Sequence, residues 1–341
     1  MPSSDTACSP DPASRLGSLI DLAPPLAIRV AASLGVADQM AAGMHDADVI
    51  AAAVQADPDA LARLLRYLVH QGVFTEEPTG YFDLTELSRL LLDRSPAGLG
   101  RRLDLEGMGG RMDLSYFGLL HSVRTGQAAY PVVHGRTLWD DLDLERRRYL
   151  DELMLVEGSR TLPQVAELYD WSAVKDVVDV GGGSGGLLTH LLTRHPHLRG
   201  VLLDLPNSSA VAEQLFAEQN LTDRTQILLG NFFEPLPAGH DVYVIARSVT
   251  GWPDAEATQI LTRMAEAAGE DGRVLIIEVL PPDPQVPYST SFDLDMLVTV
   301  GGRERTLADL NALAADAGLV STRVIRGQHA LLLMEYVCAS C

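Results

Sequence analysis

Hydrophobic residues recur at helical spacing through the first half of this chain and in short runs through the second half. Between residues 16 and 42 they follow the three- or four-residue spacing of helices, and Pro24 and Pro25 are expected to break that pattern near its start. Residues 46–55 predict another short helix. From Lys175 onward, short apolar runs alternate with helical segments, so the pattern predicts two different kinds of domain.

A further helix and a hairpin complete the first domain. Asp57 and Pro58 have the residue types of an N-cap and a first helical turn, and Gly72 marks the end of this helix. Apolar runs then flank residues 78–80, whose Pro-Thr-Gly sequence predicts a hairpin turn. Three helices followed by a hairpin predict a winged-helix-like domain over residues 15–100.

The second half predicts an α/β domain with a Rossmann-like, mostly parallel sheet over residues 169–341. Strands are expected at residues 176–180, 200–204, 226–229, 242–246 and 274–279, with helices such as 187–193 and 255–268 between them. Short apolar strands joined by helical crossovers form parallel sheets that are covered on both faces. We expect a disordered lead-in at residues 1–14, and a helical linker or substrate lid at 101–168 that includes one long helix at 147–168.

Composition and charge narrow the class of protein. The chain has 341 residues, 47% of them hydrophobic and 21% charged, which predicts a globular protein of about two domains. No run of eighteen or more apolar residues and no signal peptide is recognised, so we expect no membrane span. Cys8, Cys338 and Cys341 have neither metal-ligand spacing nor a disulfide pattern. We therefore expect a cytoplasmic protein with reduced thiols and no metal.

The acidity of the chain argues against a DNA-binding role for the winged-helix segment. The formal net charge is −20, which repels nucleic acid and anionic lipid. Residues 46–71 carry four aspartates against two arginines, whereas a DNA reader needs a basic face. We therefore expect this segment to bind a protein partner, and expect no nucleic acid or membrane partner.

A glycine-rich loop at residues 179–186 lies between a predicted strand and a predicted helix. Glycines allow the backbone to approach a ligand that a Cβ would block, and a helix N-terminus offers unpaired N–H groups. About 20 residues later, Asp204 ends the next strand, where its carboxylate can accept hydrogen bonds from ribose hydroxyls. This order predicts a cofactor that contains adenosine.

The loop is compatible with two cofactors. Gly181, Gly183 and Gly186 satisfy the dinucleotide pattern, which leaves an NAD-linked oxidoreductase as an alternative. However, Asp179 stands two residues before the first glycine, where a carboxylate can meet the ammonium of a methionine moiety. An NAD pyrophosphate would gain nothing from that charge, so we favour S-adenosylmethionine or S-adenosylhomocysteine.

Four motifs together resemble the class I small-molecule O-methyltransferases of bacterial natural-product and plant phenolic pathways. They are Asp-Val-Gly-Gly-Gly-Ser-Gly-Gly at 179–186, Leu-Asp-Leu-Pro at 203–206, Gly-Asn-Phe-Phe-Glu-Pro-Leu-Pro at 230–237 and Gly-Gly-Arg-Glu-Arg-Thr at 301–306. The resemblance covers nearly the whole chain. It implies a homodimer formed through the N-terminal domain, and a small aromatic substrate bound between the domains under the middle helices.

The same resemblance implies which residues bind the cofactor. They are Asp179, Gly181, Gly183, Asp204, Leu205, Asn231, Phe232 and Arg247. The two glycines would line the methionine and ribose, Asp204 the ribose hydroxyls, and Arg247 the far edge of the cofactor. Asn231 and Phe232 would lie at the adenine. The family usually has Asp at position 231, but an Asn side-chain oxygen can also accept from the adenine amino group.

The catalytic position departs from the family pattern. Where the family has Leu-His-Asp-Trp, this chain has Val-Thr-Gly-Trp, which places Thr250 at the position of the histidine base. A threonine hydroxyl with no neighbouring base cannot act as a base at neutral pH. Glu278 and Glu304 match two acidic residues that orient the histidine. Here they are candidates to bind substrate directly, with a structural role as the alternative: a solvent-exposed strand end for Glu278, and for Glu304 an ion pair with a neighbouring arginine.

The middle segment supplies candidate substrate contacts. These are Met154, which can pack on a flat aromatic ring, and His121, Arg111 and Tyr116. For each one, packing or a solvated helix face is the alternative.

Two enzymatic functions remain open. The first is methyl transfer to a phenolic oxygen, driven by proximity without a histidine base. The second is a repurposed enzyme that binds S-adenosylmethionine but catalyses hydroxylation, decarboxylation or pericyclic ring formation. In that case the sulfonium would act as a fixed positive charge.

Overall fold

The computed structural model describes residues 11–339, apart from residues 94, 96–97 and 281–290 and the side chains of 155–157 and 207–209. It divides into two compact units, Met1–Leu114 and Ser115–Cys341. The division falls within the segment 101–168 that the sequence predicts as a linker. The other domain boundaries remain predictions.

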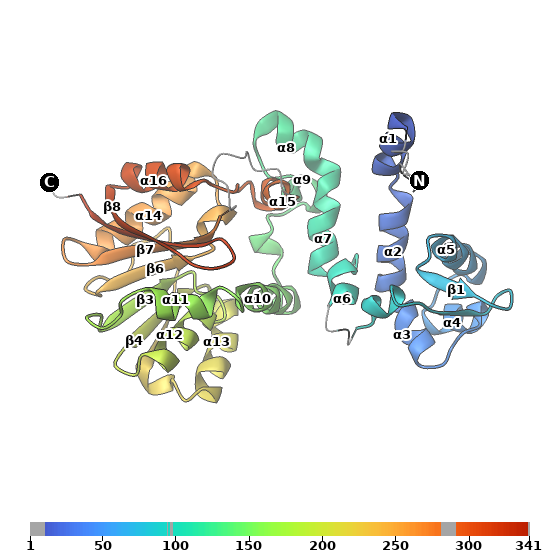
Figure 1. The fold of residues 1–341 in the computed structure, drawn as a ribbon, viewed down its shortest axis with the longest axis horizontal. Coiled ribbons are helices and arrows are strands. Elements are labelled where there is room, and N and C mark those ends of the chain that lie inside the picture. Colours follow the sequence, from blue (N-terminus) through green and yellow to red (C-terminus); the bar gives the residue numbers. More distant parts are fainter. Residues whose placement is uncertain (1–10, 94, 96–97, 281–290, 340–341) are drawn as a thin grey trace, which may run out of the picture. The chain divides into compact units, whose positions relative to one another are not determined.

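The first unit has the predicted order of helices and hairpin (Figure 1). Its elements are α1 (Pro12–Ile20), α2 (Ala23–Ser33), α3 (Val36–Ala41), α4 (Ala47–Ala53), α5 (Pro58–His70), β1 (Phe74–Glu76), β2 (Phe82–Leu84), α6 (Leu99–Leu103) and α7 (Met108–Leu114). Asp57 caps α5, because its side chain accepts a hydrogen bond of 2.9 Å from the amide of Ala60. Leu61, Leu65 and Leu68 turn one face of α5 into the core.

The N-terminal segment differs from its prediction at its start. Helix α1 begins at Pro12, within the predicted lead-in, since Asp11 accepts hydrogen bonds from the first-turn amides; residues 1–10 lie outside the described part. Pro24 and Pro25 lie in the first turn of α2, so the expected break in the helical pattern falls just before them, at Asp21 and Leu22.

One stretch of the first unit meets the length and hydropathy expected of a membrane span. It runs over Pro12–Ser33, has a mean hydropathy of 1.2, and is 11% buried. Asp21 and Leu22 divide it into α1 and α2. A single such stretch near an N-terminus is weak grounds for a membrane protein, and the cytoplasmic location remains a prediction.

The middle helices continue into the second unit. They are α8 (Leu119–Thr125), α9 (Tyr130–His134), α10 (Leu144–Gly158) and α11 (Leu162–Leu168). The prediction of one long helix over 147–168 is wrong, because α10 ends at Gly158 and α11 starts at Leu162. Pro163 lies in the first turn of α11, where proline is tolerated; inside a continuous helix it would remove a hydrogen bond.

The second unit is built on a seven-stranded sheet of order β5-β4-β3-β6-β7-β9-β8. Its strands are β3 (Asp176–Val180), β4 (Arg199–Asp204), β5 (Thr225–Leu229), β6 (Val242–Ala246), β7 (Arg273–Val279), β8 (Leu319–Arg326) and β9 (Leu331–Cys338). The five predicted strands are found within one residue of their predicted bounds, and they pair in parallel. The antiparallel hairpin β8–β9, which extends the sheet from β7, was not predicted.

Helices cover both faces of this sheet (Figure 1). On one face lie α14 (Asp254–Ala268) and α16 (Leu307–Asp316), and on the other α11, α12 (Gly186–Arg194) and α13 (Pro206–Glu218). Strand β3 shows why: Val178 and Val180 join one core cluster and Val177 the other. A strand buried on both faces needs such a continuous apolar run.

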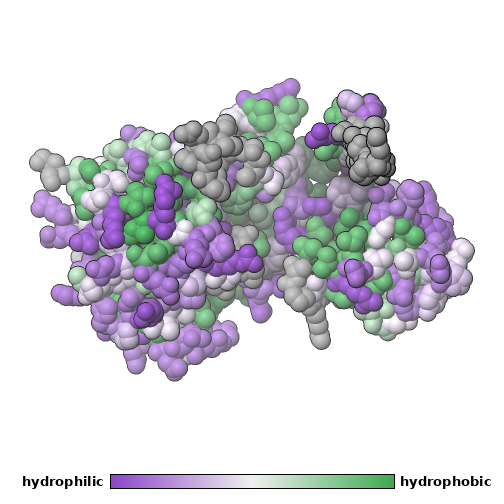
Figure 2. All heavy atoms as spheres, in the orientation of Figure 1, coloured by the Kyte–Doolittle hydropathy of each residue, from purple (hydrophilic) through white to green (hydrophobic). Residues whose placement is uncertain are grey.

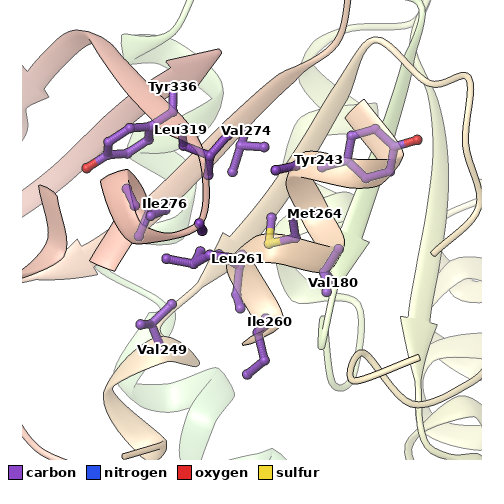
Figure 3. Packing of buried hydrophobic residues seen from close by; sticks show 14 of the residues in the cluster. Val180, Tyr243, Val249, Ile260, Leu261, Met264, Val274, Ile276, Leu319 and Tyr336 are labelled. Carbon is purple, nitrogen blue, oxygen red and sulfur yellow. The ribbon is translucent and has the colours of Figure 1, made fainter. Parts of the chain in front are cut away.

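The larger core cluster reaches the end of β6. Figure 3 shows Val249, just after that strand, in the same cluster as Ile260 and Leu261 of α14. All three side chains are fully buried. The turn that carries Thr250 is therefore anchored by core packing on its N-terminal side.

Candidate functional site

The candidate site lies at the carboxyl ends of β3 and β6, which are parallel neighbours in the sheet. The chain passes from β3 to β4 on one side, while β6 lies on the other. Where the strand order diverges in this way, an open α/β sheet leaves a crevice for ligands. The glycine loop follows β3, and a short 3₁₀ turn, Val249–Gly251, follows β6.

The glycine loop has a backbone that few other residues adopt. Gly181 has φ 70° and Gly183 has φ 59°, both in the left-handed region. The amide of Gly181 donates to the carbonyl of Leu203 at 2.8 Å, which ties the loop to β4. A Cβ at Gly181 would lie 3.1 Å from the ring of Phe232. Phe232, predicted at the adenine, therefore lies directly against the loop.

Asp204 links the loop to the end of β4. Its carboxylate accepts hydrogen bonds from the amides of Gly183 (2.8 Å) and Leu205 (2.7 Å). Arg147 of α10 reaches the same carboxylate at 3.5 Å and pairs with Asp151 at 3.1 Å. This arginine was not among the residues predicted from the sequence. Its four-residue spacing from Asp151 suggests only a local helical ion pair.

Asp179 is a buried carboxyl beneath the loop. It is 1% exposed, and a Cβ at Gly182 would lie 2.5 Å from its Oδ2. That oxygen has no hydrogen-bond partner among the described residues. Burial, and to a lesser degree the charge of Asp204, raise the pKa of Asp179 to about 7. A buried acceptor without a partner fits a ligand that brings a donor or a cation.

An aromatic cluster lies beside the loop. Trp252 makes edge-to-face contacts with Phe232 and Phe233 at ring distances of 5.6 and 4.9 Å. Trp139 stacks on Trp252 at 5.5 Å. Asn231 is exposed, and its Oδ1 accepts from the amide of Phe233 at 3.0 Å. Phe232, predicted at the adenine, thus belongs to this cluster, and Asn231 is bonded to it through Phe233. Leu205, which follows β4, is 44% exposed.

Thr250 has a carboxyl neighbour, which corrects the expectation that no base stands beside it. Glu278, at the end of β7, lies close enough to Thr250 for the polar groups of this threonine to lower the pKa of its carboxyl. Glu278 is 4% exposed, so the solvent-exposed alternative for it is wrong. Its Oε1 has no hydrogen-bond partner among the described residues.

The charges around Glu278 come from two arginines. Burial raises the pKa of Glu278 to about 7, while the polar groups of Thr250 and the charges of Arg247 and Arg305 oppose that rise. Arg247 has φ 56°, and its amide donates to the carbonyl of Ile277 at 2.8 Å. Arg247, predicted at the far edge of the cofactor, thus also lies close to the end of β7.

Arg305 holds the backbone of the Thr250 turn through hydrogen bonds. Its guanidinium is 1% exposed and donates to the carbonyls of Val249 (2.8 Å) and Trp252 (2.7 Å). It also pairs with Asp254 at 2.7 Å. From the sequence, Arg305 was expected only as a neighbouring arginine that could pair with Glu304. The burial of its side chain, which decides its role, is not encoded in any local pattern.

Glu304 lies in the segment that runs against the same turn. The amide of the preceding residue, Arg303, donates to the carbonyl of Thr250 at 3.0 Å, and the amide of Glu304 donates to Asp293 at 2.8 Å. Arg303, like Arg305, reaches Asp254. The structure therefore brings this part of the Gly-Gly-Arg-Glu-Arg-Thr motif to Thr250, as the predicted grouping of Thr250, Glu278 and Glu304 requires.

The predicted substrate contacts are divided between the units. Tyr116 donates its hydroxyl to Asp295 at 2.7 Å, His121 is half-buried on α8, and Met154 is 40% exposed on α10. These three belong to the second unit, whereas Arg111, on α7, belongs to the first. Their roles toward a substrate remain predictions.

Replacing Arg305 by Lys is expected to destabilise the second unit. An ammonium cannot reproduce the fork that reaches two carbonyls and a carboxylate, and a lost charged hydrogen bond costs about 1–3 kcal/mol of unfolding free energy. Urea unfolding should show a lower midpoint for R305K. The matched control is R303K, because the Arg303 side chain is 55% exposed. Equal midpoints for the two variants would contradict the assigned role.

Comparison with known proteins shows which family models and relatives the chain matches. A model of the O-methyltransferase domain matches residues 116–320, and one of the O-methyltransferase dimerisation domain matches residues 20–94. A 2,7-dihydroxy-5-methyl-1-naphthoate 7-O-methyltransferase of Streptomyces carzinostaticus is 45% identical over 324 residues, 94% of this chain and 96% of that protein. The aclacinomycin 10-hydroxylase RdmB of Streptomyces purpurascens is 38% identical over 311 residues, 89% and 83% of the two chains.

Solved structures of O-methyltransferases also match this chain. The O-methyltransferase NcsB1 from neocarzinostatin biosynthesis, in complex with S-adenosylmethionine and 2-hydroxy-5-methyl naphthoic acid, matches with a TM-score of 0.87 and 44% identity. The match covers 95% of this chain and 98% of that one. The cofactor bound there agrees with the one predicted from the glycine loop. The predicted fold class and the predicted kind of enzyme, a methyltransferase, are confirmed: the chain belongs to the O-methyltransferase family, with an N-terminal dimerisation domain and a C-terminal O-methyltransferase domain.

Proposed function

We propose that this chain transfers the methyl group of S-adenosylmethionine to a hydroxyl oxygen of a small aromatic natural-product intermediate, without a histidine base. The observation that best supports this proposal is that the glycine loop and the Thr250 turn lie at the carboxyl ends of two neighbouring parallel strands, β3 and β6, in a member of this family. The naphthoate named for one relative and the naphthoic acid bound by NcsB1 support an aromatic substrate.

The site residues fit this cofactor. Gly181 and Gly183 would line its methionine and ribose, and Asp204 would accept from the ribose hydroxyls. Phe232 would lie at the adenine with Asn231. The partnerless oxygen of Asp179 suits a ligand with an ammonium group, and when bound the cofactor supplies an electrophilic methyl on a positively charged sulfur.

Proximity supplies much of the catalysis in this proposal. A substrate hydroxyl held beside the methyl donor reacts as if at very high concentration, because the entropy of meeting has been lost on binding. Ser248 lies against the loop, and Thr250, two residues later, would orient that hydroxyl together with Glu278. We assign Met154, His121 and Tyr116 to the substrate side of the second unit, and keep Arg111 as a candidate contact from the first.

A non-methylating reaction is the second candidate. The observation that favours it is the hydroxylase named among the relatives, together with threonine at the position of the family's histidine. In that case the same residues would bind the cofactor as a fixed positive charge that stabilises developing negative charge.

Methyl-labelled S-adenosylmethionine separates the two candidates. The purified protein is incubated with it and with a panel of hydroxynaphthoic acids and phenolic polyketides. Label in an ether product supports methyl transfer. Turnover of an aromatic substrate without label in the product, at a site that binds the cofactor tightly, supports the second candidate and overturns the first.

Cofactor affinity is expected to depend on pH through Asp179. Its pKa of about 7 means that the carboxyl must ionise before it can attract an ammonium, so affinity should rise with pH and level off above about 7. Calorimetric titration with S-adenosylhomocysteine between about pH 6 and 8 measures this, on either side of that pKa. D179N should bind more weakly and lose this dependence, whereas the control D176N, at the start of β3, should keep it. An unchanged profile in D179N would contradict the role.

The same shift has a consequence for the stability of the cofactor-free protein. Since the pKa of Asp179 is raised from 3.8 to about 7 on folding, its contribution to stability is present at low pH and is lost as pH rises through about 7. As the pH rises from 3.8 to about 7, the free energy of unfolding should therefore fall less in D179N than in the wild type.

We further propose that the chain is a homodimer, since each unit exposes an apolar surface. Helix α1 has no buried residue, and Leu16, Leu19 and Ile20 are exposed on it. On the second unit, hydrophobic atoms gather over α8 (Figure 2), where exposed residues include Phe117, Leu120 and Val123. Patches of this kind mark interaction sites.

Sedimentation velocity at micromolar concentration is expected to give the mass of a dimer. The double variant L19E/I20E should shift the distribution toward monomer, because it places charge on an apolar surface that would otherwise be covered. V49E, at another exposed apolar residue of the first unit, is the matched control. A monomeric wild type would overturn the proposal.

A further inference from the structure

Helix α10 brings a buried carboxyl, that of Asp151, to the glycine loop. Asp151 is 4% exposed, and its Oδ1 accepts a hydrogen bond of 3.1 Å from the Nε of Arg147. Its Oδ2 is buried without a hydrogen-bond partner among the described residues. An oxygen in this situation destabilises the fold unless a donor reaches it, because burial has removed its water. Asp151 therefore offers an acceptor to a ligand that brings such a donor.

An opening separates Asp151 from the loop. A Cβ built on Gly183 would lie 4.0 Å from the Oδ1 of Asp151 and, apart from its chain neighbours, within 4 Å of no other described residue. The space beside this glycine is therefore bordered by the Asp151 carboxyl. Gly183 is one of the two glycines assigned to the methionine and ribose of the cofactor, so that part of the cofactor would meet Asp151.

The protein itself occupies most of the acceptor positions of Asp204. An ionised carboxylate offers about four lone-pair positions. The Oδ2 of Asp204 accepts from the amide of Gly183, while its Oδ1 accepts from the amide of Leu205 and, at 3.5 Å, from Arg147. These donors leave at most one position for a ligand. A ribose carries two neighbouring hydroxyls, so a second acceptor is needed for one of them.

We propose that Asp151 accepts the hydrogen bond of the second ribose hydroxyl, so that the ribose of the cofactor is held between Asp151 and Asp204. This role rests on the proposed binding of S-adenosylmethionine, and it adds a residue of α10 to the cofactor contacts that follow the strands. Arg147 joins the two carboxylates, since its Nε donates to Asp151 and its Nη2 to Asp204. One guanidinium thus holds both acceptors at the same part of the loop.

The burial and charges around Asp151 agree with this role. Burial raises the pKa of Asp151, Arg147 lowers it through its charge and hydrogen bond, and the charge of Asp204 raises it again. A hydroxyl that donates to Oδ2 would stabilise the ionised carboxylate and offset part of the effect of burial. A four-residue ion pair on a helix surface needs no such burial, whereas Arg147 is only 9% exposed.

Calorimetric titration with S-adenosylhomocysteine and with its 2′-deoxy and 3′-deoxy analogues tests the role of Asp151. In the wild type each analogue should bind at least about tenfold more weakly than the parent, because each lacks one hydrogen bond to a charged acceptor. D151A should bind the parent more weakly by a similar factor. One of the two analogues should then bind D151A as tightly as the parent does, since the hydroxyl that it lacks no longer has an acceptor.

The cycle of variant and analogue separates a direct contact from mere support of Arg147. If Asp151 only held Arg147, D151A would weaken the binding of the parent and of both analogues by the same factor, and the role would be overturned. E152Q, at the next residue of α10, is the matched control, because the Glu152 side chain is 41% exposed and pairs with Arg148. It should keep the wild-type affinity for all three ligands.

A second measurement uses the unaltered protein. A crystal structure of the full chain with S-adenosylhomocysteine should place a carboxyl oxygen of Asp151 within about 3 Å of one ribose hydroxyl. A carboxyl oxygen of Asp204 should lie within the same distance of the other. A complex in which Asp204 binds both hydroxyls, or in which Asp151 meets only Arg147 or the cofactor ammonium, would contradict the role.

The outcomes separate the role of Asp151 from the function on which it rests. A wild type that binds neither S-adenosylmethionine nor S-adenosylhomocysteine overturns the proposed function, and the role of Asp151 with it. Binding by the wild type, with equal losses in D151A for the parent and both analogues, overturns the role of Asp151 alone. A penalty that D151A removes for one analogue only supports both.

Discussion

The parallel pairing of β3 with β6 is the constraint on which the site depends. Because parallel strands carry their carboxyl ends at the same edge, the glycine loop after β3 and the Thr250 turn after β6 lie side by side. The next pairing, of β6 with β7, sets Ala246 opposite Ile277 and so brings the residues that follow them, Arg247 and Glu278, together. Residues far apart in sequence become neighbours because each ends a strand.

Burial at that edge gives the carboxyls their unusual properties. Asp179 and Glu278 each have a pKa of about 7, and in both the main cause is the loss of water around the charged form. They differ in their neighbours, since Asp179 faces the charge of Asp204 while Glu278 faces Arg247, Arg305 and the Thr250 hydroxyl. The first environment suits a carboxyl that binds a cationic ligand, and in the second the arginines and Thr250 favour the ionised carboxylate against the effect of burial.

Rigid support keeps this arrangement in place. Arg305 binds the carbonyls on either side of Thr250, and Val249 anchors the turn in the core (Figure 3). On the other side of the loop, Arg147 ties α10 to Asp204. Core packing and arginine contacts thus hold the Thr250 turn and the glycine loop on the sheet.

The amino-acid sequence alone was enough to predict the fold class, the five parallel strands and the cofactor loop, because each rests on local patterns: apolar runs, glycines before a helix, and an aspartate at a strand end. It missed the β8–β9 hairpin and the break between α10 and α11, where long-range pairing and a single proline outweighed local periodicity. The three-dimensional packing was needed to show that Thr250 has a carboxyl neighbour, that Arg305 is buried, and that Arg147 reaches Asp204. Those contacts join residues from different strands and helices, and their chemistry depends on burial, which no spacing along the chain encodes.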